Sequence, residues 1–212
     1  MKIKIKLSII LLVIIVLSAI FAPLVSTYNP LEIQKGKQFL PPSMIHYFGT
    51  DEFGRDVFSR TLYAGRISLL AGLVAVIISA LVGVPLGLIS GYYGKIIDTC
   101  IMRTMDSLLA FPALLLALCI VAVLGPSSLN AMIAVSIVSI PNFARISRAS
   151  ILTQKEKDYV EAAVSIGASD KRVIFFTILP NCIGPILVQI TIAVAFAILV
   201  EAALSFLGLG TQ

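Results

Sequence analysis

The residues best suited to chemistry lie in one short loop, GTDEFGRD, from Gly49 to Asp56. It carries two aspartates, Asp51 and Asp56, and two carboxylates at close spacing can act as general acid and general base. Such catalysis also needs a partner base or a set of metal ligands, and the sequence holds a single histidine, His46, just before the loop. We therefore predict that Asp51, Arg55 and Asp56 serve packing, and not catalysis.

The rest of the sequence indicates no metal or nucleic acid site. The three cysteines are far apart and have apolar neighbours, so neither a metal-ligand spacing nor a disulfide framework is suggested. The net charge of +5 could favour nucleic acid, but the basic residues lie at the ends of apolar runs, where membrane topology explains them. We predict that the chain binds no metal and no nucleic acid.

One further carboxylate, Glu201, lies inside an apolar run near the C-terminal end of the sequence. A charged side chain within a membrane span is costly and usually faces a protein interior or a water-filled cavity. Two interpretations stay open at this point. Glu201 lines a water-filled pathway between the spans, or it lies close enough to the outer membrane surface to reach water.

The elements that must position these residues are membrane helices. Of 212 residues, 58% are hydrophobic and 13% are charged, and the mean hydropathy is +1.03, which indicates a polytopic membrane protein. A spanning helix needs about 20 apolar residues. We predict an all-α integral membrane protein, a helical bundle of about five spans. They are Leu7 to Val25, Ile67 to Gly94, two antiparallel spans within Ser107 to Ala144 around a GPSSLN turn, and about Ile183 to Leu207.

The first apolar run could also be a signal peptide, but it is long for one, and Pro23 lies where a cleavage site would be expected. We favour an uncleaved span. Residues 1–66 then form an N-terminal membrane helix and an extracytoplasmic loop. Residues 67–212 form the transmembrane domain, with a cytoplasmic loop at about residues 153–181.

The orientation follows from the lysines and arginines in the loops. With a cytoplasmic N-terminus, five basic residues lie in the outer loop, and they are Lys35, Lys37, Arg55, Arg60 and Arg66. The other eleven lie in inner segments, and they are Lys2, Lys4, Lys6, Lys95, Arg103, Arg145, Arg148, Lys155, Lys157, Lys171 and Arg172. Cytoplasmic loops carry the excess of basic residues, so we predict a cytoplasmic N-terminus.

A polar stretch interrupts the apolar sequence at YVEAAVSIGASDKRVIFFTILPN, residues 159–181. TQKE at residues 153–156 has the form of a capping box that would begin a short helix, and Gly167 suits the left-handed residue that ends it. Ser169 would cap a second short helix, stopped by Pro180. Spacing alone fits an ordinary solvated hairpin as well as a docking surface.

The order of residues in this stretch resembles the EAA loop of ABC importer permeases. Glu161, Ala162 and Ala163 are followed by three residues and Gly167, and after nine more residues comes a four-residue block that ends with Leu179 and Pro180. A second EAA triplet, at residues 201–203, has a leucine where the glycine should be and no Leu-Pro after it. The spacing therefore carries the resemblance, and the triplet alone does not.

Three other stretches resemble the peptide and nickel branch of these permeases, in its dipeptide permease C-like subunit. They are residues 49–69, residues 105–118 (MDSLLAFPALLLAL) and residues 201–210 (EAALSFLGLG). The resemblance implies the six-span, MetI-like importer permease fold. Chains of this family continue beyond the SFLGLG segment, so we expect this sequence, which stops at Gln212, to be truncated before the last transmembrane helix.

The resemblance implies a multi-pass permease subunit in the plasma (inner) membrane of a prokaryote, which moves peptides or nickel. Its partners would be a second permease subunit, two ABC ATPase subunits, an extracytoplasmic substrate-binding protein and the lipid membrane. In the family the loop that holds Asp51, Arg55 and Asp56 lies outside the membrane, where gating or contact with a receptor is an alternative to packing. The sequence has no G-x-x-x-x-G-K phosphate loop, so ATP would be used by the partner subunits, and we expect no cofactor on this chain.

In the EAA loop, Glu161 would meet polar or basic groups of the ATPase, Ala162 and Ala163 would allow close packing, and Gly167 would make the turn. The alternative from another class is an energy-independent channel or a membrane enzyme. Either would need several polar residues within the spans, where Glu201 is nearly alone.

Overall fold

The computed structural model describes residues 2–210, with side chains from residue 6, so Gln212, where the sequence stops, lies outside the described residues. The chain divides into two compact units, Met1–Leu70 and Ala71–Gln212, which are described separately. Between residues 2 and 210 the structure is helical or irregular, and the only β pairing is an isolated bridge between Thr50 and Asp56. The predicted all-α fold class is confirmed.

The first unit contains an apolar helix, a short helix and an irregular loop. These are α1 (Lys2–Ile20), α2 (Ala22–Val25) and the segment that leads into α3 (Val57–Tyr93), whose first residues up to Leu70 belong to this unit. The described side chains of α1 are almost all exposed in the isolated chain, as expected for a helix that lipid surrounds. Between α2 and α3 the chain is irregular, apart from the bridge between Thr50 and Asp56.

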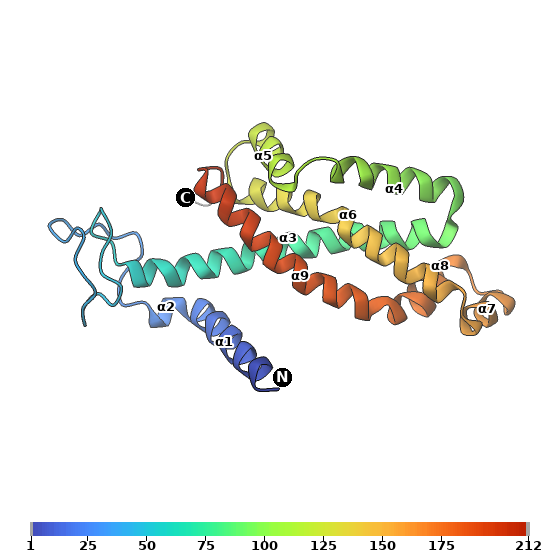
Figure 1. The fold of residues 1–212 in the computed structure, drawn as a ribbon, viewed down its shortest axis with the longest axis horizontal. Coiled ribbons are helices and arrows are strands. Elements are labelled where there is room, and N and C mark those ends of the chain that lie inside the picture. Colours follow the sequence, from blue (N-terminus) through green and yellow to red (C-terminus); the bar gives the residue numbers. More distant parts are fainter. Residues whose placement is uncertain (1, 211–212) are drawn as a thin grey trace. The chain divides into compact units, whose positions relative to one another are not determined.

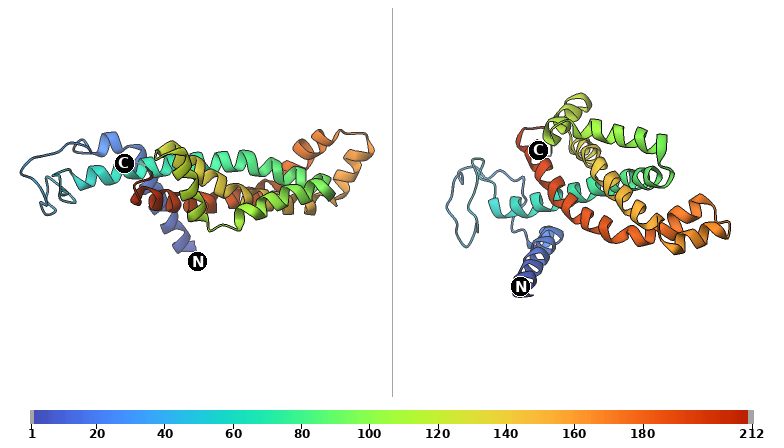
Figure 2. Two further views of the ribbon diagram at one scale, coloured as in Figure 1. Left: turned by 90° about the horizontal axis from the view of Figure 1, so that it is seen from above. Right: turned by 45° about the vertical axis from the view of Figure 1, so that its right-hand side comes forward.

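The second unit is a helical bundle. After α3 it contains α4 (Lys95–Leu109), α5 (Ala113–Leu124), α6 (Ser128–Lys155), α7 (Asp158–Ser165), α8 (Asp170–Arg172), a π-helical segment η1 (Val173–Ile178) and α9 (Leu179–Phe206). Figure 1 shows α6 and α9 side by side, with α7 at one end of the unit and the C-terminal end of α9 at the other, and Figure 2 agrees.

Three of these helices are long and apolar enough to cross a membrane. They are Val57–Tyr93, Ser128–Lys155 and Asp170–Phe206, and α4 with α5 passes the same test as a pair bent by 90°. The apolar part of α1 is shorter, at Lys6–Ile20. The residues between the predicted spans Ile67 to Gly94 and Ser107 to Ala144 form most of the helix α4. Pro112 explains the break after α4, because proline has no backbone donor and disfavours a helical residue before it.

The helix α3 approaches α6 closely through glycines spaced four residues apart, at Gly83, Gly87 and Gly91. A methyl group added at Gly83 would lie 2.6 Å from the Ile140 carbonyl oxygen, and one at Gly87 would lie 2.7 Å from the Ser147 Cβ. Small residues at this spacing let two helix backbones meet, which is a main source of helix association in lipid. The contact fixes α6 against α3.

The polar stretch joins α9 without the stop predicted at Pro180, so that prediction is wrong. From Asp170 the helix continues through η1 into α9, where Pro180 lies in the first turn. A helical proline cannot donate to the preceding turn and its ring clashes with the carbonyl four residues earlier. The widened π turn just before Pro180 relieves that conflict, since such single turns insert into α-helices without ending them.

We predict that Gly87→Ala weakens the packing of α3 on α6 by about 1–3 kcal/mol, the usual result of forcing extra volume into a packed contact. The matched control is Gly184→Ala in α9, where an added methyl group meets no atom within 4 Å. Both substitutions gain the same helix propensity, so their difference isolates the contact. The measurement is the unfolding free energy of each variant in detergent micelles, and equal values for the two would contradict the glycine packing.

Candidate functional site

The predicted docking residues lie on α7 and the turn that follows it. Glu161 and Ala162 are exposed, together with Val164 and Ile166, whose side chains are 51% and 86% exposed. Large apolar side chains at this exposure beside a carboxylate favour a surface that another protein covers. We call Glu161, Ala162, Val164, Ser165 and Ile166 the α7 surface.

The start of α7 differs from the prediction. Thr153 lies inside α6, and its hydroxyl donates to the Ala149 carbonyl oxygen at 3.1 Å, so it does not cap a new helix. The capping box prediction is wrong, because α6 continues to Lys155 and the threonine bonds to its own preceding turn. A bend follows, and α7 begins after Lys157, which has extended backbone geometry.

The end of α7 is a Schellman turn at Gly167, as the sequence predicted. Gly167 has a φ of +80°, its N–H donates to the Val164 carbonyl oxygen at 2.9 Å, and the Ala168 N–H donates to the Ala163 carbonyl oxygen at 3.1 Å. These two bonds satisfy carbonyls that a helix end leaves open, and glycine adopts the left-handed conformation without steric cost. The direction of the chain after α7 is therefore fixed locally.

The opposite face of α7 is anchored in an apolar cluster. Val160 is 3% exposed and packs in a cluster that includes Ile151 of α6 and Val173 and Ile178 of η1. Ala163 and Leu179 are half-buried against the same cluster. Burial of one face stabilises the short helix, which would be marginal alone. Ser169 is at the N-cap of α8 but makes no side-chain cap hydrogen bond.

Hydrogen bonds also connect this turn to the end of α3. The Tyr92 hydroxyl donates to the Asp170 carboxylate at 3.0 Å, and the Lys155 ammonium donates to the Tyr92 carbonyl oxygen at 2.6 Å. Three elements, α3, α6 and α8, are thereby joined around one tyrosine. These bonds hold the α7 surface at a defined place relative to the bundle.

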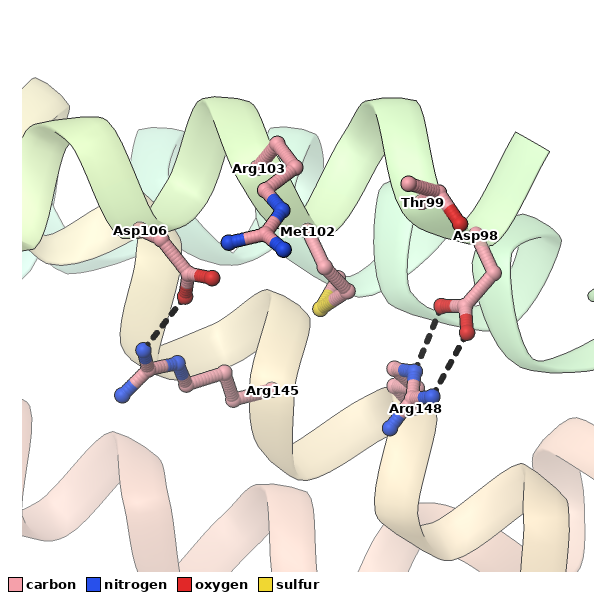
Figure 3. A pocket seen from close by; sticks show the side chains of 7 residues that line it. All are labelled: Asp98, Thr99, Met102, Arg103, Asp106, Arg145 and Arg148. Atoms are coloured by element: carbon pink, nitrogen blue, oxygen red, sulfur yellow. Dashed lines mark hydrogen bonds and ion pairs between the residues drawn. The ribbon is translucent and has the colours of Figure 1, made fainter. Parts of the chain in front are cut away.

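Two arginines of α6 pair with two aspartates of α4 (Figure 3). Arg148 donates through Nε and Nη2 to the two oxygens of Asp98, each at 2.6 Å, and Arg145 donates to Asp106 at 2.6 Å. The first pair is bidentate and half-buried, which makes it the stronger of the two. With Arg103 they border a polar hollow of about 480 Å3. The amphipathic α4 is held to α6 by these charges.

The aspartates of the GTDEFGRD loop accept hydrogen bonds from the loop itself. The Ser59 N–H donates to Asp56 at 2.8 Å, so Asp56 caps the start of α3, and His46 Nδ1 lies 3.0 Å from the other Asp56 oxygen. Asp51 accepts from the backbone N–H groups of Phe53 and Arg55, and from Arg55 Nε at 2.7 Å. Both carboxylates are used for structure, and Asp56 is 1% exposed.

These contacts lower the pKa of both carboxyl groups. Burial by itself raises the pKa of Asp56, but hydrogen bonds from Ser59 and from His46 outweigh it and hold the pKa below its ordinary value. Burial likewise opposes the shift at Asp51, and the hydrogen bonds from Arg55 and Phe53 together lower that pKa. Neither carboxyl group is tuned toward neutral pH, as a general acid would need.

Glu201 is buried in α9, with 3% of its surface exposed, and accepts a hydrogen bond from the Ser205 hydroxyl at 2.8 Å. Little of this carboxylate is open to a pathway in the isolated chain. Within the described residues no group of three or more histidine, cysteine, aspartate or glutamate side chains could hold a metal ion.

Sequence reasoning missed a second hollow, of about 250 Å3, between α6 and α9. Asn142 and Gln189 contribute carboxamides to its wall, and Ser139 contributes a buried hydroxyl. The signal that could have identified them is an uncharged amide inside a run without charges. An amide is far less conspicuous there than Glu201, and nothing in the sequence shows that residues 142 and 189 meet.

Comparison with family models identifies two regions. Residues 83–212 match the model described as binding-protein-dependent transport system inner membrane component. Residues 6–42 match the model described as the N-terminal TM domain of oligopeptide transport permease C. Together they cover the apolar N-terminal helix and nearly all of the second unit.

Comparison with curated proteins gives relatives along nearly the whole chain. It is 48% identical over 212 residues to a dipeptide transport system permease protein of Alkalihalophilus pseudofirmus, covering 99% of this chain and 70% of that protein. It is 45% identical over 207 residues to a di/tripeptide transport system permease protein of Pseudomonas aeruginosa, covering 95% of this chain and 68% of that protein.

Among solved structures, an inward-facing conformation of the MetNI methionine ABC transporter matches with a TM-score of 0.59. The match covers 68% of this chain and 73% of that chain at 18% identity, so it shows a shared fold. The predicted MetI-like architecture is confirmed.

We predict that the first turn of α3 loses stability in acid because Asp56 must then be protonated. A carboxyl group with a lowered pKa contributes its stability above the ordinary value, 3.8, and loses it as the pH falls through the lowered pKa. The measurement is the exchange protection of the Ser59 amide, relative to an unstructured peptide at the same pH.

The variant Asp56→Ala should lower that protection at neutral pH, by about 1 kcal/mol, and remove its acid dependence. Glu52→Gln, at an exposed position in the same loop, is the control and should behave like the unaltered chain. An acid-induced loss of equal size in Asp56→Ala would contradict the assignment.

Proposed function

Because the chain belongs to the family of binding-protein-dependent transport system inner membrane components, we propose that it moves peptides across the inner membrane as one permease subunit of an ATP-driven importer. The peptide cargo is supported by relatives that are named as dipeptide and di/tripeptide permeases. The sequence has no phosphate loop, so separate ATPase subunits supply the energy and this chain binds no nucleotide.

The observation that carries this function is the α7 surface, which is exposed on one side and anchored on the other. Val160 and Ala163 fix α7 to the bundle, while Glu161, Ala162 and Ile166 remain free for a partner. A rigid, short helix that projects from a membrane bundle can transmit the movement of an ATPase to the helices that line a pathway. The movement shifts the permease between two conformations, because the ATPase makes different contacts with each of them.

We assign a role to each predicted residue of the EAA loop. Glu161 meets polar or basic groups of the ATPase, Ala162 allows close approach, and Gly167 fixes the turn. Leu179 and Pro180 lie at the start of α9, where Leu179 packs against the cluster that anchors α7. They therefore act through the position of α7, and the contact itself is made by the α7 surface.

The complete importer contains a second permease subunit, two ABC ATPase subunits and an extracytoplasmic substrate-binding protein. We place the N-terminus and α7 on the cytoplasmic side and the GTDEFGRD loop outside, on the basis of the lysine and arginine asymmetry. Asp51, Arg55 and Asp56 stiffen that outer loop for contact with the binding protein. Glu201 is buried in α9, where its hydrogen bond from Ser205 stabilises the helix beside the pathway.

We predict that Glu161→Lys lowers ATP-dependent uptake of a labelled dipeptide by roughly tenfold or more, the effect of losing about 1.4 kcal/mol of docking free energy. Gly167→Pro should have the same effect, because proline cannot adopt the positive φ of the turn. The measurements are uptake into proteoliposomes that hold the whole importer, and copurification of the ATPase.

The matched control is Glu156→Lys, which reverses a charge at an exposed position just before α7. It should keep both uptake and ATPase association. Normal uptake by stably expressed Glu161→Lys and Gly167→Pro variants would refute the coupling role, whereas a native importer that moves nickel and no peptide would refute the cargo.

We predict a cytoplasmic N-terminus from the distribution of lysines and arginines among the loops, and labelling of single cysteines tests this orientation. In a chain without its three native cysteines, Glu52→Cys should react with a membrane-impermeant thiol reagent in intact cells. Ser165→Cys should react only in inside-out vesicles. Labelling of position 165 from outside intact cells would reverse the topology.

A further inference from the structure

The hollow between α6 and α9 is a polar site inside the membrane-spanning region. Its wall consists of Ser139 and Asn142 from α6 and Gln189, Ile192, Ala193 and Phe196 from α9. The α9 residues are spaced three and four apart and therefore share one face of that helix. Two helices that are far apart in sequence thus contribute hydrogen-bonding side chains to one surface.

One polar group of this hollow has no partner. The Ser139 hydroxyl is buried, with 2% of the residue exposed, and no described group hydrogen-bonds to it. Leaving a buried hydroxyl unpaired costs about 1–3 kcal/mol. The site is therefore left with unused hydrogen-bonding capacity.

The hollow also lies near the middle of two spans. Asn142 is near the centre of Ser128–Lys155, and Gln189 is near the centre of Asp170–Phe206. Lipid offers no hydrogen bonds at that depth, so polar side chains there face a protein interior or a water-filled cavity. Substrate sites of membrane transporters commonly lie near the midplane for the same reason.

The chemistry of the wall defines the ligand. A carboxamide carries both a donor and an acceptor, and a hydroxyl does too, so they pair well with the N–H and C=O of a peptide group. None of the three polar side chains is charged, so the wall does not select cargo by charge. A surface of this kind suits peptides of varied side chains, since all of them share the same backbone.

The size of the hollow indicates one wall of a larger passage. Pockets that enclose a small ligand have volumes of about 300–1,000 Å3, and this one has about 250 Å3. Ile192 and Phe196, which are 59% and 37% exposed, extend the wall outward with apolar surface. A second surface opposite them completes the passage in the assembled importer.

We propose that Ser139, Asn142 and Gln189 line the transport pathway and hydrogen-bond the backbone amide groups of a peptide in transit. This proposal rests on the proposed peptide transport and adds to it the residues that face the cargo. It assigns them a role that the coupling loop and Glu201 do not fill.

The first test asks whether the hollow faces water and peptide. In the assembled importer without native cysteines, Asn142→Cys and Gln189→Cys should react with a charged thiol reagent roughly ten times faster than Val188→Cys. Val188 is the neighbour of Gln189 and is 60% exposed in the isolated chain. Only the thiolate reacts with the reagent. Apolar surroundings raise the pKa of a thiol, and each unit of that rise lowers the thiolate fraction, and so the labelling rate, about tenfold. A transported tripeptide should slow the labelling of both.

The second test measures transport. Asn142→Leu combined with Gln189→Leu should lower ATP-dependent peptide uptake roughly tenfold, since each lost hydrogen bond weakens binding several-fold. The control is Thr191→Val, which removes a hydroxyl of α9 that donates to the Val188 carbonyl oxygen of its own helix. It should leave uptake unchanged, and ATPase association should be normal in both variants.

Equal labelling at positions 142, 188 and 189 would overturn the proposal, and so would labelling that the peptide does not slow. Full uptake by the doubly substituted variant would do the same. Failure of the proposed function is separate from these results, because it would appear as no peptide uptake by the unaltered importer.

Discussion

The close approach of α3 to α6 is the contact on which the rest of the second unit depends. Gly83, Gly87 and Gly91 present no side chain toward α6, and Ser79, four residues earlier, donates a hydrogen bond to the Ser136 carbonyl oxygen at 2.9 Å. Lipid is as apolar as the helices, so packing and such hydrogen bonds must hold them together. Every other feature of the unit is placed relative to α6, and therefore relative to this contact.

Two functional surfaces follow from the position of α6. At one end it turns into α7, whose buried face packs with Ile151, the residue that also contacts Gly91. Near its centre it carries Asn142 opposite Gln189 of α9, which is helical without a stop from Asp170 onward. The helices α6 and α9 thus connect the α7 surface with the hollow that we propose as the peptide contact.

The polar groups of the protein are used in different ways at different depths. In the GTDEFGRD loop, Asp51 and Asp56 are fully engaged by backbone and side-chain donors, which explains why paired carboxylates there do not indicate catalysis. Asp98 and Arg148 form a bidentate pair that connects α4 to α6. Ser139 differs from all of these because its hydroxyl has no hydrogen-bond partner among the described residues, which leaves it available for the proposed peptide contact.

The sequence by itself determined the membrane class, the places of the long helices, the left-handed turn at Gly167 and the family resemblance. These depend on hydrophobic runs and on residue types at short spacing, which act locally. Only the tertiary structure decided that α4 is a helix paired with α6, that Pro180 is accommodated by a π turn, and that Asn142 and Gln189 line one hollow. Those outcomes join segments far apart in the chain, and packing, which local propensity does not encode, selects them.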